Sequence, residues 1–151
     1  MSEHSRLERL DGLDATERAL VEEALQARAQ AHAPYSGFRV GAAVKGVDGS
    51  THRGCNVESA SYGLTMCAER VALFAARAAG VTGIEAIAVA GAAHGDRALP
   101  PCGACRQVIH DLAGDVPVLL ATLDGRVERW TGAELLPAAF DAEFLEPEDR
   151  S

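Results

Sequence analysis

The sequence predicts an α/β protein, a three-layer α/β/α sandwich with a mixed five-stranded sheet. Segments with helical periodicity alternate with short apolar segments of strand length, in the order α-β-β-α-β-α-β-β-α. A sheet whose strands are separated by helices in this way needs helices on both of its faces. At 151 residues the chain can bury a core in one domain. We expect a single domain over residues 1–151, with a core over about 15–145 and short flexible termini.

The first predicted helix covers about residues 15–31. Asp14 and Glu17 have the spacing of a capping box, in which each side chain bonds a backbone N–H of the other residue. Small or apolar residues then recur at helical spacing, at Leu20, Ala24, Ala27 and Ala31. Pro34 ends this helix and begins a turn.

A β-hairpin and a second helix follow. The strands are predicted over Phe38–Lys45 and Thr51–Val57, because Asp48-Gly49 between them is a typical hairpin turn. After a polar loop, the alanine-rich segment Met66–Ala79 has the composition of a helix, and Gly80 closes it.

The remaining elements complete the sheet. Ile84–Ala90 is a short apolar run, which predicts a central strand buried on both faces. Gly103–Ala113 is the next predicted helix. The strands Val116–Thr122 and Arg126–Trp130 must be antiparallel, because the link between them is too short for a crossover. A capping box that starts at Thr131 begins the last helix.

The composition excludes several classes of function. No apolar run approaches the roughly 20 residues that cross a bilayer, and the N-terminal segment lacks the apolar core of a secretory signal. The net charge of −8 and the single lysine, Lys45, argue against a nucleic-acid partner, which requires clustered Lys and Arg. Four cysteines without a signal indicate cytosolic thiols. We therefore expect a cytoplasmic protein with a small-molecule substrate and no membrane or nucleic-acid partner.

Three cysteines and one carboxylate match the requirements of a catalytic zinc site. Cys67 lies at the start of the second predicted helix, and Cys102 and Cys105 lie at the start of the third. Helix N-termini favour thiolates, and catalytic zinc takes three protein ligands and leaves the fourth position to water. We expect one Zn²⁺ per chain on these cysteines. Glu69 is the predicted catalytic residue, because it is free to move protons.

Arg70 and Arg106 each directly follow a predicted site residue. Either guanidinium can donate a hydrogen bond to cysteine sulfur and offset the charge of three thiolates, and the alternative is that both are surface charges. The alternative for the cysteines is a closed structural zinc site with four ligands. Cys55 would be the fourth, but it has no matching spacing, and we interpret it as a buried small apolar residue.

Further motifs extend this pattern to most of the chain. They are Ala33-Pro34-Tyr35-Ser36, Phe38-Arg39-Val40-Gly41-Ala42-Ala43, Gly54-Cys55-Asn56-Val57-Glu58, Cys67-Ala68-Glu69-Arg70, Pro101-Cys102-Gly103-Ala104-Cys105-Arg106-Gln107, and Leu135-Leu136-Pro137 with Phe140. In these motifs the chain resembles the small homotetrameric zinc-dependent cytidine deaminases of pyrimidine salvage. The resemblance implies the cytidine deaminase-like fold, a homotetramer, and hydrolysis of cytidine and 2′-deoxycytidine to the uracil nucleosides plus ammonia.

The resemblance also implies substrate-binding residues. Asn56 and Glu58 match the pair that binds the ribose 3′-hydroxyl, and alternate strand positions face the same side of a sheet. Phe38 matches an aromatic of the nucleoside pocket. Ala68 matches the position whose backbone contacts the base.

Two aromatic residues match the family pattern, and one residue differs from that pattern. Tyr62 and Phe140 match aromatics that tetrameric members place near a neighbouring subunit's pocket, although from the residues alone Phe140 is ordinary helix-end core. The family usually has Asn directly after the ribose-binding Glu, whereas this chain has Ser59. The loop over residues 59–65 is therefore expected to be held differently.

Other functions remain as alternatives. A zinc deaminase of another aminopyrimidine nucleoside, such as a blasticidin-like antibiotic, shares the metal motif. Glu58 favours the plain nucleoside, because the antibiotic deaminases resemble this family but lack that carboxylate. A nucleic-acid-editing module is disfavoured by the net charge of −8.

Overall fold

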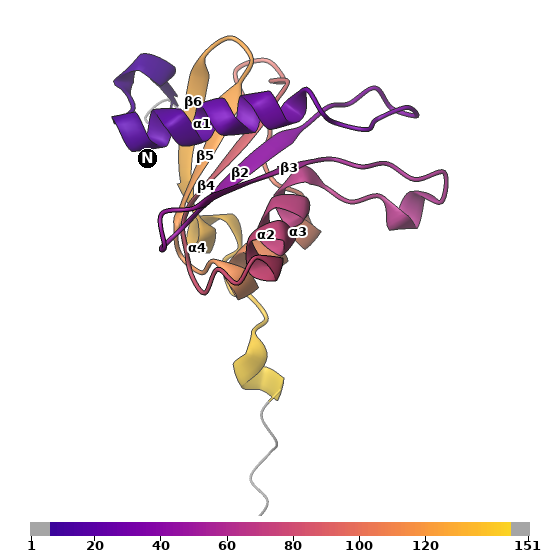
Figure 1. Ribbon diagram of the computed structural model, residues 1–151, viewed down its shortest axis with the longest axis vertical. Coiled ribbons are helices and arrows are strands. Elements are labelled where there is room, and N and C mark those ends of the chain that lie inside the picture. The colour runs from indigo at the N-terminus through magenta and orange to yellow at the C-terminus, as the bar shows by residue number, and fades with distance from the viewer. Residues whose placement is uncertain (1–6, 146–151) are drawn as a thin grey trace, which may run out of the picture.

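The computed structural model describes residues 7–145, and the predicted flexible ends at 1–6 and 146–151 lie outside the described residues (Figure 1). One mixed sheet has the strand order β1-β6-β5-β4-β2-β3. The strands are β1 Leu7–Arg9, β2 Gly41–Gly46, β3 Thr51–Cys55, β4 Ile84–Gly91, β5 Pro117–Thr122 and β6 Arg126–Thr131. The helices are α1 Ala15–Arg28, α2 Ala68–Ala78, α3 Gly103–Leu112 and α4 Gly132–Leu135.

The strand pairing follows the sequence prediction in its central part. β2 and β3 form the expected antiparallel hairpin, and β5 and β6 form the second one. β4 lies between β2 and β5, antiparallel to the first and parallel to the second. As expected for a central strand, β4 is buried along most of its length.

The prediction of five strands is wrong, because β1 adds a sixth at the edge of the sheet. β1 pairs antiparallel with β6, with Leu7 opposite Glu128. Three residues are too few for an alternating pattern to be recognised in a sequence. An ion pair also holds this edge: Arg129 of β6 contacts Glu8 of β1 at 3.3 Å and bonds Glu17 of α1.

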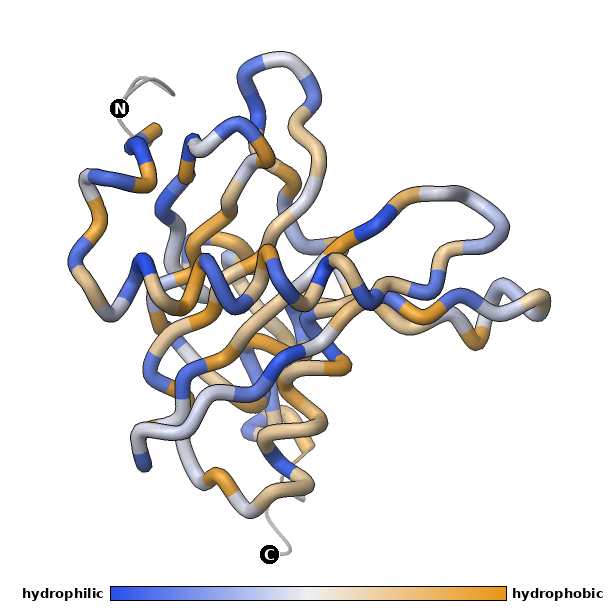
Figure 2. The backbone as a smooth tube through the Cα atoms, turned by 45° about the horizontal axis from the view of Figure 1, so that its top comes forward, coloured by the Kyte–Doolittle hydropathy of each residue, from blue (hydrophilic) through white to orange (hydrophobic). Residues whose placement is uncertain are grey.

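Each face of the sheet buries its own apolar cluster. Alternate residues of a strand point to opposite faces, so along β4 Ala88 and Ala90 join one cluster while Ile87 and Val89 join the other. α1 supplies its buried residues to the first cluster, and α2 and α3 supply theirs to the second. Figure 2 shows hydrophobic residues concentrated in the middle of the molecule, where these clusters lie.

Two glycines let the helices approach the sheet closely. A Cβ on Gly41 would lie 2.0 Å from the Ala24 carbonyl oxygen of α1. A Cβ on Gly54 of β3 would lie 2.4 Å from the Ala68 carbonyl oxygen and 2.4 Å from the Ala72 nitrogen of α2. Any larger residue at Gly54 would therefore displace the N-terminal turn of α2. Among the described helices, none has the length and apolarity required to cross a membrane.

Candidate metal centre and active site

The three predicted cysteine ligands lie together at the adjoining N-termini of two helices. Cys67 is the N-cap residue of α2 and Cys102 is the N-cap residue of α3, and Cys105 lies in the first turn of α3. The Sγ atoms of Cys67 and Cys102 are 3.8 Å apart, and those of Cys102 and Cys105 are 3.5 Å apart. All three sulfur atoms lie within 4.8 Å of one another.

This arrangement fits a tetrahedral zinc ion. Zinc–sulfur bonds of about 2.3 Å at tetrahedral angles separate sulfur atoms by about 3.8 Å. The observed separations of 3.5 and 3.8 Å are close to that value. The described residues contain no other group of three or more His, Cys, Asp and Glu side chains placed to share a metal ion. Cys55, the fourth cysteine, is half-buried on β3 and is not part of the cluster.

The sulfur atoms differ in their affinity for a proton. Hydrogen bonding from the Cys105 thiol, together with the nearby Arg70 guanidinium, lowers the pKa of Cys67 to about 5. The pKa of Cys105 is raised, because its thiol proton is held against Cys67 and because the side chain is buried. Arg70 Nη2 donates to Cys67 Sγ at 3.4 Å, as the sequence analysis expected.

Glu69 lies directly beside the cluster and is almost completely buried, with 4% of its surface exposed. Its Oε2 atom accepts from Cys105 Sγ at 3.7 Å. Burial raises the pKa of this carboxyl group, and the neighbouring Cys67 thiolate raises it further. Ala68, between Cys67 and Glu69, is fully buried where α2 meets Gly54. The start of α2 therefore presents a carboxyl group and a sulfur atom to the same place.

The hydrogen bond from Arg106 to sulfur is not observed, and that expectation is wrong. The Arg106 Nε atom donates to the Pro101 carbonyl oxygen at 2.8 Å, and Nη1 donates to the Leu135 carbonyl oxygen at 2.9 Å. Backbone carbonyl oxygens on both sides of this side chain accept its hydrogen bonds in place of sulfur. Arg106 thus ties the residue before Cys102 to α4.

Asn56 is buried and holds an extended segment at the start of the sheet. Its Oδ1 atom accepts from the Val40 backbone N–H at 2.9 Å, and its Nδ2 atom donates to the Phe38 carbonyl oxygen at 2.7 Å. These bonds explain why β2 begins at Gly41 and not at Phe38 as predicted: the backbone of residues 38–40 bonds a side chain in place of a neighbouring strand. The side chain keeps one N–H and one lone pair for other partners.

Glu58 is half-buried and accepts three hydrogen bonds from one turn. Its carboxylate accepts from the Tyr35 N–H at 3.0 Å, from the Ser36 N–H at 3.1 Å and from the Ser36 hydroxyl. The Ser36 hydroxyl is the largest cause of a lowered pKa of Glu58, so the carboxylate stays ionised. The sequence analysis missed this role of Ser36. Its position in a Pro-Tyr-Ser-Gly turn was the available signal, because serine often bonds neighbouring groups in turns.

The predicted aromatic residues lie on exposed segments. Phe38 has 47% of its surface exposed and lines a cavity of about 360 Å³. Most of that cavity is formed by the loop before Cys102, through Ala92, Ala93, His94, Arg97, Ala98, Leu99 and Pro100. Tyr62 is 77% exposed on a 3₁₀ turn, and its ring meets the Tyr35 ring edge-on, with ring centres 6.2 Å apart. These turns belong to two long loops that project from one side of the sheet (Figure 1).

The Ser59 hydroxyl group bonds within the loop over residues 59–65, which begins where this chain has Ser in place of the usual Asn. Ser59 Oγ accepts from the Ser61 N–H at 3.1 Å, and the Ser59 N–H donates to Thr65 Oγ1 at 3.1 Å. The loop is therefore closed by short serine and threonine side chains.

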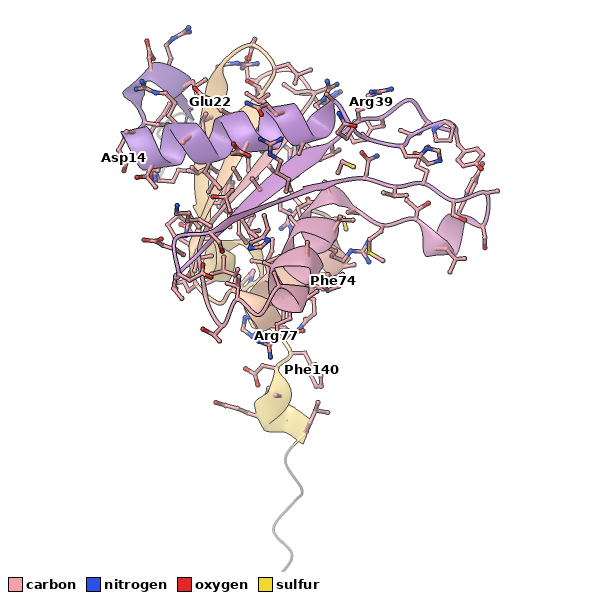
Figure 3. The ribbon with its side chains drawn as sticks, in the orientation of Figure 1. Asp14, Glu22, Arg39, Phe74, Arg77 and Phe140 are labelled. Atoms are coloured by element: carbon pink, nitrogen blue, oxygen red, sulfur yellow. The ribbon has the colours of Figure 1, made fainter. Side chains whose placement is uncertain are left out.

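Phe140 does not contribute to the core and lies away from the cysteines of its own chain. It is 57% exposed and stacks on Phe144, with ring centres 5.8 Å apart. Gln107 of α3 donates to its carbonyl oxygen at 2.8 Å, which ties the C-terminal segment to α3. Figure 3 shows Phe140 beyond Arg77 at the C-terminal end of α2, whereas the cysteines lie at the N-terminal end of that helix.

Comparisons with known proteins agree with this geometry. The model of the family described as "Cytidine and deoxycytidylate deaminase zinc-binding region" matches residues 14–120. A cytidine deaminase from Halalkalibacterium halodurans is 54% identical over 127 residues, which are 83% of this chain and 95% of that protein. The blasticidin-S deaminase of Bacillus cereus is 30% identical over 107 residues, or 67% of this chain and 76% of that protein.

A solved structure gives the same result in three dimensions. The crystal structure of cytidine deaminase from Burkholderia pseudomallei superposes with a TM-score of 0.77 at 45% identity. The match covers 93% of this chain and 100% of that one. With a family match over most of its length, a close relative at 54% identity and the cysteine cluster in place, the chain belongs to the cytidine and deoxycytidylate deaminase family.

Proposed function

We propose that this protein is a zinc-dependent cytidine deaminase, which hydrolyses cytidine and 2′-deoxycytidine to uridine and 2′-deoxyuridine and releases ammonia. The observation that carries the proposal is the buried carboxyl group of Glu69 beside three converging cysteine sulfurs. The high identity to a protein named cytidine deaminase supports the choice of substrate, and the antibiotic deaminase is a more distant relative.

Each side chain has a separate task in this reaction. Cys67, Cys102 and Cys105 hold one zinc ion per chain, which when bound makes water a nucleophile at neutral pH. Arg70 donates to Cys67 Sγ and offsets the negative charge of the sulfur ligands.

Glu69 moves the protons. Its carboxylate takes a proton from the attacking water and delivers it to N3 of the cytosine ring. It then carries the second water proton to the amino group at C4, which leaves as ammonia, so water and cytidine become uridine and ammonia. A buried carboxyl group with a raised pKa suits this exchange, because burial makes the carboxyl group easier to protonate than an exposed glutamate.

A panel of nucleosides tests the proposal. Zinc-loaded protein is expected to convert cytidine and 2′-deoxycytidine with the absorbance change of deamination, and a chelated sample is expected to be inactive. Adenosine and blasticidin S in the same assay provide the comparison. Preference for blasticidin S would replace the proposed substrate, and no turnover of any of these compounds would reject the reaction.

Asn56 and Glu58 are proposed to bind the ribose 3′-hydroxyl. Glu58 stays ionised and is only half-buried, so its carboxylate can accept a further hydrogen bond from a sugar hydroxyl. We expect 3′-deoxycytidine to have a kcat/KM about 5- to 150-fold below that of cytidine, because leaving such groups without a partner costs about 1–3 kcal/mol. Steady-state kinetics with both nucleosides measures this ratio.

The control for this prediction uses the same turn. Glu58→Ala should reduce the ratio of kcat/KM between cytidine and 3′-deoxycytidine. Ser36→Ala loosens the turn but keeps the carboxylate, so this ratio should stay the same. Equal turnover of both nucleosides by the unmodified protein would remove the ribose-binding role.

A homotetramer is proposed from exposed apolar surface. α2 buries Ala68, Ala72 and Ala76 against the sheet, yet Phe74 is 44% exposed on its outer side (Figure 3). Tyr62 and Phe140 are exposed on segments that project from the body. Large aromatic side chains are enriched in protein–protein interfaces. Because Phe140 is exposed on a segment that projects from the body, a neighbouring subunit's pocket is its proposed place.

We expect the protein to sediment near four times 15.8 kDa. Phe140→Ala is expected to raise KM for cytidine several-fold, with little change in melting temperature, because Phe140 belongs to neither apolar cluster of the described residues. Phe144→Ala removes the stacked neighbour and should leave KM closer to the unmodified value. A fully active monomer at assay concentration would contradict both the tetramer and the role of Phe140.

Other parts of the sequence prediction remain proposals as well. We infer a single domain in which the two apolar clusters separate three layers, since α1 packs on one face of the sheet and α2 and α3 on the other. We also infer a cytoplasmic enzyme of pyrimidine salvage. All four cysteines are free thiols, as is usual in a reducing compartment. The net charge of −8 supports a free nucleoside over a nucleic acid as substrate.

A further inference from the structure

The loop between β4 and α3, residues 92–101, leads directly to Cys102. It makes one tight turn, in which His94 and Arg97 exchange backbone hydrogen bonds at 3.0 and 3.1 Å. After this turn the chain enters the interior, where Ala98 is 3% exposed. No helix or strand of the described chain includes these ten residues, so their position depends on side-chain contacts.

Glu128 of β6 provides such a contact, on the face of the sheet that α2 and α3 cover. Its Oε1 atom accepts from the Ala98 backbone N–H at 2.8 Å. Its Oε2 atom accepts from the indole Nε1 of Trp130 at 3.1 Å. One oxygen is therefore fixed by a large, partly buried ring, and the other oxygen holds the loop.

The chain from Ala98 to Cys102 is short and stiff. Leu99 packs tightly on β4, because a Cβ on Gly91 would lie 2.5 Å from its side chain. Pro100 and Pro101 follow, and the pyrrolidine ring fixes φ in each of them. Pro101 is fully buried, and its carbonyl oxygen accepts from Arg106. A displacement at Ala98 is therefore passed on to Cys102 and is not absorbed by the link.

We propose that Glu128 is a positioning residue of the metal centre. By holding Ala98 it sets where the Cys102 sulfur lies relative to Cys67 and Cys105, although it touches neither metal ligand nor substrate. The inference rests on the proposed zinc site. It adds a residue that is 26 positions after Cys102 in the sequence and lies on a different element.

Zinc retention tests this role. The zinc-loaded protein and its variants are mixed with a chromogenic chelator, and the rate of zinc release is followed. Glu128→Ala is expected to release zinc about tenfold faster, the lower end of the effect seen when groups that orient metal ligands are lost. Glu128→Gln should release zinc more slowly than Glu128→Ala, because its amide oxygen can still accept from the Ala98 N–H, although its NH2 group cannot accept from the Trp130 N–H.

Arg129→Ala is the matched control. Arg129 is the next residue of β6, but it points to the other face of the sheet and bonds Glu17 of α1 and Glu8 of β1. The Arg129→Ala variant should have a lower melting temperature but the same rate of zinc release as the unmodified protein. If Glu128→Ala fails to fold, Glu128→Asp serves in its place, because it keeps the charge but shortens the reach, and it should release zinc faster than the unmodified protein.

Two outcomes would overturn the role of Glu128 but leave the proposed zinc site standing. One is zinc release at the unmodified rate from the folded Glu128 variant. The other is equal acceleration in Arg129→Ala, which would show a general loss of stability. Unmodified protein that binds no zinc on titration would instead overturn the zinc site, and this inference with it.

Discussion

Replacing Glu69 with glutamine is expected to lower kcat for cytidine by about 10²- to 10⁴-fold, the usual contribution of a positioned proton-transfer group. Glutamine has nearly the same shape as glutamate, so it fits the buried site without a cavity. Its amide group is uncharged and cannot take a proton from water. Zinc content should therefore remain at one per chain while turnover is lost. Absorbance kinetics and metal analysis of the same preparation measure both quantities.

The matched control is Glu22→Gln, which makes the same chemical change on the exposed side of α1 (Figure 3). It should leave kcat and zinc content unchanged. A Glu69→Gln variant that keeps full zinc and full turnover would show that another group moves the protons. Loss of zinc together with activity would assign Glu69 to the metal site and not to catalysis.

The sequence predicted most of the fold because most of its signals are local. The capping box at Asp14 is partly visible in the structure, where Asp14 accepts from the Glu17 N–H, and the box at Thr131 is complete. Hairpin turns and the apolar run of β4 are likewise encoded in a few neighbouring residues. β1 could not be predicted in this way. It is held by pairing with β6 and by contacts such as that from Arg129 to Glu8, 121 residues apart.

The metal cluster was predictable for a similar reason. Helix N-termini are recognisable in a sequence, and Cys67 and Cys102 are at two of them. Whether two such termini lie side by side depends on how the helices pack on the sheet. Gly54 is an example, because only a residue without a Cβ lets α2 approach β3 so closely. The partners of long polar side chains were the least predictable part. Arg106 and Glu128 bond backbone groups of distant segments, and no sequence spacing indicates which carbonyl or N–H lies within reach.

Replacing Cys102 with alanine is expected to remove zinc and abolish detectable deamination. Cys102 is the exposed member of the cluster, so the substitution opens no cavity in the core. Any loss of melting temperature should then report the binding energy of the metal, which stabilises only the folded chain. Metal analysis, a thermal melt and the cytidine assay on one preparation measure the three effects.

Cys55→Ala is the control for that variant, because it removes a thiol from β3 that lies outside the cluster. It should keep one zinc per chain and full turnover, with at most a small loss of stability from a half-buried side chain. Two ligands bind zinc much more weakly than three, so added zinc should restore Cys102→Ala only at concentrations far above those that saturate the unmodified protein. Full zinc occupancy and full activity in Cys102→Ala would exclude Cys102 as a ligand. Zinc loss in Cys55→Ala as well would favour the closed four-cysteine site, in which no position is left for water.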